Sequence, residues 1–254
     1  MRTDEPRWGG PEPAWRLLGP LITGSVNTLF DLRVAGLRHI PRAGPALVVA
    51  NHLAHLDPLV LLTAFLRGRG RRVRFLALAA LFDDPVVGWW LRRARALPVE
   101  RGKGVAPVVE VATRALDHGE VVVVYPEGRL QRGRWLTARP GAGAIALATD
   151  APILPVALWG MQPELPGPRR GRPAAVEIGA PLRAAQLGTC DPQTASAVLL
   201  GRIRAELLPR ARMRCGFPPD HPDGDPALAL EETGSSWRTA RALARRYLQP
   251  VRRA

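Results

Sequence analysis

Cysteine, lysine and aromatic residues are scarce in this sequence of 254 residues. The only two cysteines, Cys190 and Cys215, are too few for a disulfide framework or a cysteine-rich metal site. Aromatic residues make up 6% of the chain, and they do not alternate with basic residues as they do in single-strand or RNA-binding modules. The low aromatic content and the missing aromatic-basic pattern therefore argue against a nucleic-acid-binding protein.

Long hydrophobic runs are absent as well. The N-terminus mixes acidic and basic residues and no apolar segment follows it at once, which is not typical of a signal peptide. Residues 17–32 are fairly apolar, but Pro20, Asn27 and Asp31 make the segment too polar to span a bilayer. We therefore expect a protein that is soluble or bound to a membrane surface.

Basic residues are abundant, and the net charge is +14 with a pI near 11.5. Lys103 is the only lysine, so nearly all of the positive charge is carried by arginine. A surface this basic favours anionic partners, namely nucleic acid, anionic lipid or phosphorylated substrates.

The middle of the chain alternates strand-like and helix-like patterns, which predicts one layered α/β domain with a mixed, mostly parallel sheet flanked by helices. The valines of 121–124 have no polar alternation, as expected of a central strand buried on both faces. We expect four parts. Residues 1–32 form an N-terminal tail and an amphipathic helix interrupted near Pro20, and residues 33–215 form the main domain. Residues 216–235 form a linker, and residues 236–254 form a basic C-terminal helix. Expected strands are 33–37, 46–50, 73–78, 96–99, 121–125, 153–158 and 175–178, and expected helices within the domain are 58–66, 85–95, 105–117, 141–149 and 192–212.

The segment 51–57 places a histidine and an aspartate directly after an apolar strand. On a regular helix His52 and Asp57 would diverge by roughly 140°, so they can meet only if the loop between them curls. A histidine held by a carboxylate is a general base. In the simpler alternative Asp57 caps the following helix, with Pro58 at its first position. A metal site with His52, His55 and Asp57 is disfavoured because no second cluster at metal-ligand spacing exists.

Three other segments suit a chemical role, and each of them also has a simpler structural interpretation. Residues 101–104 (Arg-Gly-Lys-Gly) precede a helix and suit a phosphate site, or form a solvated basic loop. Residues 125–129 (Tyr-Pro-Glu-Gly-Arg) follow the valine strand, as the His52 loop follows its own strand. One interpretation is that the two segments meet at the same strand end, and the other is that residues 125–129 form an ordinary turn. Trp89 and Trp90, beside arginines, suit a membrane-interface helix, or one of them is buried in the core.

Together these segments resemble the glycerophosphate acyltransferase family, most closely its 1-acylglycerol-3-phosphate (lysophosphatidic acid) acyltransferases. The first family motif, Asn-His-x-x-x-x-Asp, matches 51–57. The second, an Arg after a small apolar strand, matches Arg101, and the third, Phe/Tyr-Pro-Glu-Gly-Thr/Arg, matches 125–129. The fourth, a Pro within a β-rich run, matches Pro155. Order and spacing agree from residue 33 to residue 179.

The chain departs from the family pattern in two places. Leu78 and Ala80 stand where many members have Lys and Glu, and Arg129 follows Glu-Gly directly where many have Thr. Arg139 stands before Pro-Gly, where members often have a basic residue. These departures leave the expected glycerol-3-phosphate acyltransferase-like fold intact but leave the acceptor open.

The resemblance implies transfer of a fatty acyl group from acyl-CoA or acyl carrier protein to a lysophospholipid, giving phosphatidic acid. His52 would deprotonate the acceptor hydroxyl and Asp57 would orient the imidazole. Arg101, Glu127, Gly128 and Arg129 would bind the acceptor. No metal or resident cofactor is implied, nor is nucleic acid. The expected location is cytoplasmic, peripheral on the inner face of an anionic membrane. Another lipid or sugar-linked alcohol as acceptor, and a non-catalytic lipid-binding protein, remain as alternatives.

Overall fold

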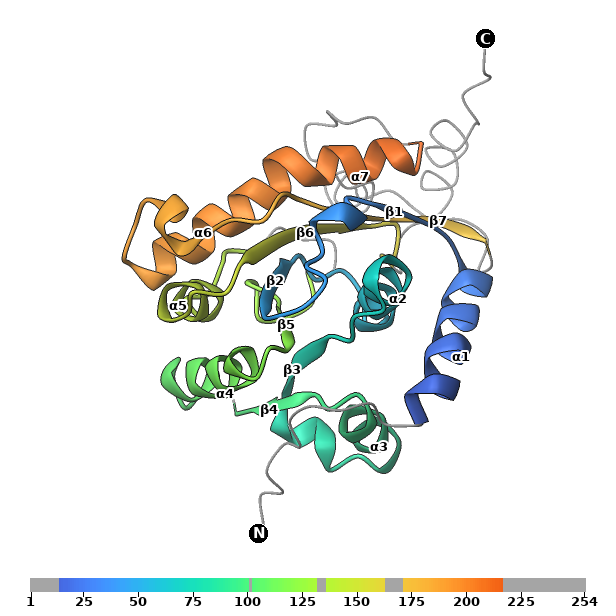
Figure 1. Cartoon of the computed structure of the whole chain (residues 1–254), viewed down its shortest axis with the longest axis horizontal. Coiled ribbons are helices and arrows are strands. Elements are labelled where there is room, and N and C mark those ends of the chain that lie inside the picture. Colours follow the sequence, from blue (N-terminus) through green and yellow to red (C-terminus); the bar gives the residue numbers. More distant parts are fainter. Residues whose placement is uncertain (1–13, 101, 132–135, 163–170, 217–254) are drawn as a thin grey trace, which may run out of the picture.

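A seven-stranded sheet with the order β1-β7-β6-β2-β5-β3-β4 forms the centre of the molecule (Figure 1). This architecture comes from a computed structural model, which describes residues 14–100, 102–131, 136–162 and 171–216. Every strand pair is parallel except β6–β7, which is antiparallel. The predicted mixed, mostly parallel sheet is therefore confirmed. The linker and basic helix expected after residue 216 lie outside the described residues.

The strands follow the hydrophobic pattern closely. Their bounds are β1 Phe30–Ala35, β2 Ala46–Ala50, β3 Arg74–Leu78, β4 Leu97–Val99, β5 Val121–Val124, β6 Ile153–Trp159 and β7 Arg172–Ile178. The α-helices are α1 Ala14–Leu29, α2 Asp57–Arg69, α3 Pro85–Arg93, α4 Ala106–Asp117, α5 Gly141–Ala148, α6 Pro192–Arg202 and α7 Leu208–Arg214. Short turns η1 Leu37–His39, η2 Ala79–Phe82 and η3 Ala184–Leu187 are 3₁₀-helical, whereas η4 Ile203–Leu207 is a π-helical turn between α6 and α7.

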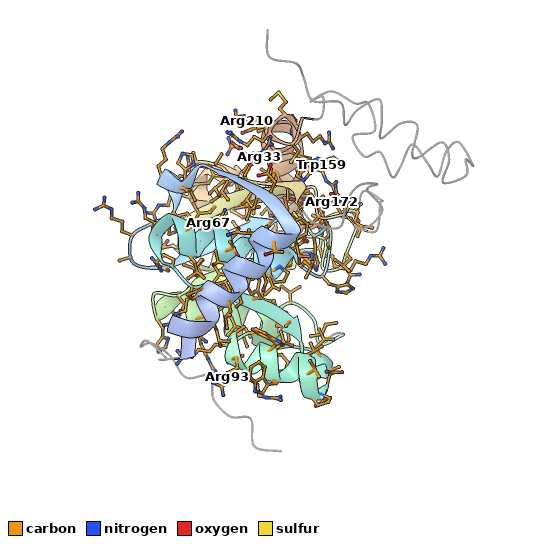
Figure 2. All side chains as sticks on the ribbon, turned by 90° about the vertical axis from the view of Figure 1, so that its right-hand side faces the viewer. Arg33, Arg67, Arg93, Trp159, Arg172 and Arg210 are labelled. Atoms are coloured by element: carbon orange, nitrogen blue, oxygen red, sulfur yellow. The ribbon has the colours of Figure 1, made fainter. Side chains whose placement is uncertain are left out.

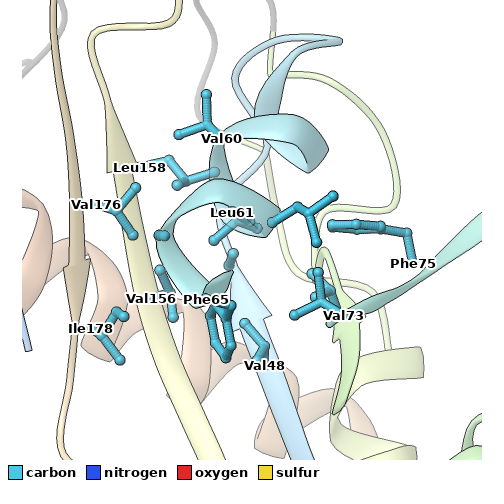
Figure 3. Packing of buried hydrophobic residues seen from close by; sticks show 14 of the residues in the cluster. Val48, Val60, Leu61, Phe65, Val73, Phe75, Val156, Leu158, Val176 and Ile178 are labelled. Carbon is cyan, nitrogen blue, oxygen red and sulfur yellow. The ribbon is translucent and has the colours of Figure 1, made fainter. Parts of the chain in front are cut away.

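Two hydrophobic layers enclose the sheet because successive side chains of its buried strands point to opposite faces. Val48 and Val156 pack with Leu61 and Phe65 of α2 on one face (Figure 3). On the other face, Val49 belongs to the layer formed with α4, α5, α6 and α7. The central strands β2, β5 and β6 are thus buried on both sides, and the loops that follow β2 and β5 start from this buried sheet.

The structure differs from the sequence prediction in the first helix. Pro20 lies inside α1, which continues unbroken from Ala14 to Leu29. Proline removes one backbone hydrogen bond, but Ile22 and Val26 are buried in the core layer on the α2 side and hold the helix there. Among the described residues, no helix combines the length and apolarity needed to cross a membrane.

The paired tryptophans do not belong to the core. Trp89 is 44% exposed and Trp90 is 38% exposed, so the core-facing alternative for this helix is wrong. Their rings meet edge to face at 5.3 Å, and the Arg93 guanidinium lies over the Trp89 ring. Figure 2 shows arginines at both ends of the domain: Arg93, the last residue of α3, lies at one end, and Arg33 of β1 and Arg210 of α7 lie at the other.

Candidate active site

The loops that follow β2 and β5 lie side by side. These two strands are parallel neighbours, and their last paired residues are Val49 and Val124. Because parallel strands end at the same edge of a sheet, residues 51–57 and 125–131 meet there. The expectation that the two segments share a strand end is confirmed by direct hydrogen bonds between them.

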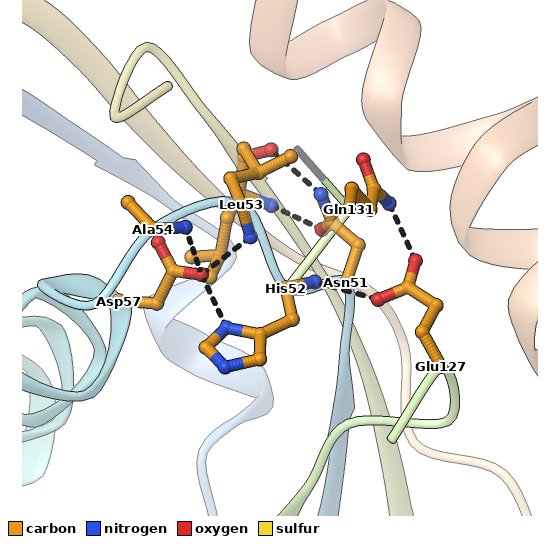
Figure 4. Close-up of polar contacts among 8 residues, drawn as sticks. Asn51, His52, Leu53, Ala54, Asp57, Glu127 and Gln131 are labelled. Carbon is orange, nitrogen blue, oxygen red and sulfur yellow. Dashed lines mark hydrogen bonds and ion pairs between the residues drawn. The ribbon is translucent and has the colours of Figure 1, made fainter. Parts of the chain in front are cut away.

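The loop after β2 curls, and His52 and Asp57 therefore meet. The Asp57 N–H donates to the Ala54 carbonyl and closes a tight turn. Asp57 Oδ2 then lies 2.8 Å from His52 Nδ1 and also accepts the N–H groups of Leu53 (2.6 Å) and Ala54 (3.0 Å) (Figure 4). The helix cap is Leu56, and the Asp57 side chain makes no capping bond. The N-cap prediction for Asp57 is therefore wrong, because its carboxylate points back toward the loop.

The contact with Asp57 defines the tautomer of His52. A carboxylate that already accepts two N–H groups is an acceptor, so Nδ1 carries the ring proton and Nε2 is left unprotonated in the neutral ring. Burial raises the pKa of Asp57, whereas its bond to His52 lowers it. Within the described part of the chain, His52 Nε2 has no hydrogen-bond partner, and the side chain is 18% exposed. The ring can therefore accept a proton from an incoming hydroxyl.

Tyr125 supports the face of the histidine. The two rings stack with their centroids 4.0 Å apart and an angle of 11° between their planes. The phenol oxygen is buried without a partner among the described residues, and this burial, with the nearby Asp57 and Glu127 carboxylates, raises the pKa of Tyr125. The stack restricts rotation of the imidazole and keeps Nδ1 aligned with Asp57.

Glu127 and Gln131 hold the backbone of His52 from both sides. Glu127 Oε2 accepts the His52 N–H at 2.8 Å, and the Gln131 N–H donates to the His52 carbonyl at 2.9 Å. The Gln131 side-chain amide also donates to Glu127 Oε1 (Figure 4). Burial raises the pKa of Glu127, and the bonds from Gln131 and His52 oppose that rise. Glu127 therefore contacts the base through the protein backbone.

Asn51 ties the start of the same loop to the neighbouring strand β6. Its side-chain amide donates to the Leu158 carbonyl (3.1 Å) and accepts the Leu158 N–H (2.8 Å). The side chain thus continues the hydrogen bonding of the sheet one residue beyond β2. Neither Asn51 nor Gln131 was assigned a role from sequence. Asn51 is the first residue of the motif at 51–57, and Gln131 lies two residues beyond the motif at 125–129.

Gly128 and Arg129 lie at the exposed end of the second loop. Gly128 has φ of 66°, which disfavours any other residue there, and a Cβ would lie 2.8 Å from Cδ of Arg139, so the Arg139 side chain would have to move. The Arg139 N–H donates to the Pro126 carbonyl and holds this arginine against the loop. Two arginines therefore flank the glycine beside the His52 loop.

The segment expected to bind phosphate after β4 is described only in part. Arg101 lies outside the described residues, and Lys103 pairs with Glu100 at 2.6 Å on the surface. Across the described ranges, no three His, Cys, Asp or Glu side chains are grouped to hold a metal ion. His55 is exposed.

A family model described as Acyltransferase matches residues 31–159, half of the chain. The crystal structure of a 1-acyl-sn-glycerophosphate acyltransferase, PlsC, from Thermotoga maritima has the same fold: the TM-score is 0.56 with 23% identity, covering 75% of this chain and 78% of that one.

Three curated relatives each match a little more than half of the chain. An uncharacterized protein of Mycobacterium tuberculosis is 35% identical over 58% of this chain and 42% of its own length. A chloroplastic 1-acyl-sn-glycerol-3-phosphate acyltransferase of Arabidopsis thaliana is 26% identical over 54% of this chain and 38% of its own length. A lyso-ornithine lipid O-acyltransferase of Pseudomonas aeruginosa is 31% identical over 51% of this chain and 47% of its own length. The matched regions thus span less than half the length of these relatives.

Proposed function

The chain belongs to the acyltransferase family, and we propose that it moves a fatty acyl group from acyl-CoA or acyl carrier protein to a lysophospholipid hydroxyl. The favoured acceptor is 1-acylglycerol-3-phosphate, which would give phosphatidic acid. The observation that carries the proposal is the contact between His52 Nδ1 and Asp57, which directs Nε2 of the ring outward as a base.

The proposed reaction needs only this pair and the two substrates. His52 Nε2 takes the proton of the acceptor hydroxyl while the hydroxyl oxygen attacks the thioester carbonyl. Collapse of the tetrahedral intermediate breaks the carbon–sulfur bond, and the imidazolium returns the proton to the leaving thiolate. Asp57 stabilises the imidazolium in between. The products are an ester and a free thiol.

Acceptor binding is assigned to the basic groups beside this pair. Arg129 is exposed next to the His52 loop, and Arg101 is assigned with it on the basis of its motif; a guanidinium suits the phosphate of the acceptor. Gly128 leaves space for close approach. Both oxygens of Glu127 accept hydrogen bonds from the protein, which supports a role in orienting His52 rather than in direct contact with phosphate.

A second acceptor class deserves a test because one relative, at 31% identity, is a lyso-ornithine lipid O-acyltransferase. That headgroup is not a phosphate ester. Leu78 and Ala80, which replace the Lys and Glu of many members, lie at the end of β3 and the start of η2. A change in acceptor headgroup between relatives is compatible with such changes outside the His–Asp pair.

We also propose that the protein works at a membrane surface and contacts it through α3. The exposed apolar side chains of this region are Leu81, Val86, Val87, Trp89 and Trp90. Exposed Arg92 and Arg93 end the same helix. Tryptophan with arginine is typical of a helix that lies in the interface of an anionic bilayer.

The test is a screen of the purified full chain. Lysophosphatidic acid, lyso-ornithine lipid and simple alcohols would each be paired with acyl-CoA and acyl carrier protein donors, with free thiol measured and products identified by mass spectrometry. We expect acceptor-dependent thiol release that is largest for lysophosphatidic acid and lost in a folded His52→Ala variant. Absence of acceptor-dependent thiol release with every pair would refute the acyltransferase proposal and favour a lipid-binding protein.

A further inference from the structure

A π-helical turn follows α6 at the edge of the active site. In η4 the Leu208 N–H donates to the Ile203 carbonyl, five residues earlier. Pro209 follows this turn, and a proline cannot donate to the carbonyl four residues before it, so the wider turn accommodates it. Such turns recur at functional sites. These residues lie beyond the 31–159 region matched by the family model.

The turn presents Arg204 to the carboxylate that holds His52. Arg204 Nη2 lies 3.6 Å from Glu127 Oε1 and donates to the Leu136 carbonyl at 2.5 Å. The arginine side chain is 26% exposed, whereas that of Glu127 is fully buried. One guanidinium therefore contacts both Glu127 and the backbone of Leu136.

We propose that Arg204 is a positioning residue for acyl transfer, which fixes the Glu127 carboxylate so that Glu127 holds the His52 backbone in place. This inference rests on the proposed function. It links the C-terminal helices to the base through two steps, from Arg204 to Glu127 and from Glu127 to the His52 N–H.

Electrostatics give this arrangement a measurable signature. Burial raises the pKa of Glu127, and Arg204 opposes that rise. In the described residues, the ionisable groups that face Glu127 are His52, Arg204 and Tyr125. Loss of Arg204 should therefore raise the pKa of Glu127 further. A protonated Glu127 holds the His52 N–H more weakly, because a charge-assisted bond is about twice as strong as a neutral one.

The activity test compares Arg204→Leu and Arg204→Lys with Arg202→Leu. Arg202 is the matched control because it ends α6, two residues before Arg204, and pairs with Glu206 at the protein surface. For Arg204→Leu we expect kcat to fall by ~10- to 100-fold, the scale of a small misplacement of a catalytic group. The acid limb of the pH profile should move to higher pH, and the acceptor KM should stay near that of the natural protein. Arg204→Lys should recover part of both effects.

A second measurement reports on Arg204 without any substrate. The ¹⁵N–¹H signal of the His52 amide should follow the titration of Glu127, and Arg204→Leu should move that transition to higher pH. Glu127→Gln should abolish the transition and make a further Arg204 change ineffective. If Arg204→Leu does not fold, Arg204→Lys still tests the inference, since it should shift the transition by a smaller amount.

The outcomes separate the two proposals. An unchanged His52 amide transition and acid limb in the Arg204 variants would overturn the positioning role. A raised acceptor KM with unchanged kcat would also overturn it and identify Arg204 as an acceptor ligand. If the natural protein transfers no acyl group, the proposed function fails, whereas the amide titration still decides whether Arg204 controls Glu127.

Discussion

Asp57 Oδ2 lies 2.8 Å from His52 Nδ1, and it reaches this position by pointing away from the helix that Asp57 begins. The same oxygen accepts the two loop N–H groups that follow the histidine. An aspartate at a helix start commonly caps the helix. Here the carboxylate instead organises the loop and the imidazole together, which makes separate predictions possible for activity and stability.

Replacing His52 by alanine should remove the base. We expect kcat to fall at least ~100-fold, since a positioned general base typically accelerates a reaction by about 10²- to 10⁴-fold. The fold should persist because the side chain is partly exposed and lies in a loop. The control is His55→Ala, which removes an exposed histidine of the same loop and should keep full activity. A folded His52→Ala protein with near-normal turnover, measured by thiol release, would contradict the mechanism.

Asp57→Asn should separate catalysis from stability. We expect turnover to fall by at least ~100-fold because the amide neither fixes the tautomer nor stabilises the imidazolium. Burial raises the pKa of Asp57 above 3.8, so the folded state binds its proton more tightly than the unfolded state. The Asp57 contribution to stability is then present at low pH and lost as pH rises through the folded pKa.

The corresponding measurement is thermal unfolding of Asp57→Asn and the natural protein across pH. The melting temperature of Asp57→Asn relative to the natural protein should increase as pH rises from about 4, near the unfolded pKa. A variant that retains turnover and loses only stability would support a purely structural aspartate.

Arg129→Ala should act on the acceptor. Loss of a charge-assisted bond, worth about 1.5–3 kcal/mol, should raise the apparent KM of lysophosphatidic acid by roughly 10-fold or more. The donor KM should change much less, and Arg101→Ala should behave in the same way. Arg114→Ala is the control, because Arg114 pairs with Glu110 on the exposed face of α4. Equal changes in both KM values would argue against the assignment.

Changing Trp89 and Trp90 together to alanine should weaken membrane binding. Both side chains are exposed, so the melting temperature should change little. The natural protein should sediment with anionic vesicles at low salt and be partly released at high salt, because basic residues near the surface contribute about 1 kcal/mol each. The double variant should lose the salt-resistant part.

Met213→Ala is the control for this experiment, since it removes an exposed apolar side chain from α7. It should bind vesicles as the natural protein does. Equal binding to neutral and anionic vesicles, with no effect of salt, would refute the electrostatic contribution.

Local sequence patterns predicted much of the fold. The expected strand 46–50 coincides with β2, and 121–125 differs from β5 by one residue. The edge strand β1 was placed three residues late, because its start depends on pairing with β7. The expected helix 192–212 covers α6, η4 and α7. The π-turn within it was missed because Pro209 alone does not specify how a helix adapts to it.

The sequence by itself determined the alternation of strands and helices and the presence of a histidine, a carboxylate and a Glu-Gly-Arg segment at strand ends. These are properties of short segments, set by hydrophobic period and residue chemistry. Only the tertiary structure decided that Asp57 turns back to His52, that buried Glu127 holds the histidine backbone, and that Arg204 reaches Glu127 from a distant helix. Strand order and packing bring these groups together, and no local pattern encodes either distance or burial.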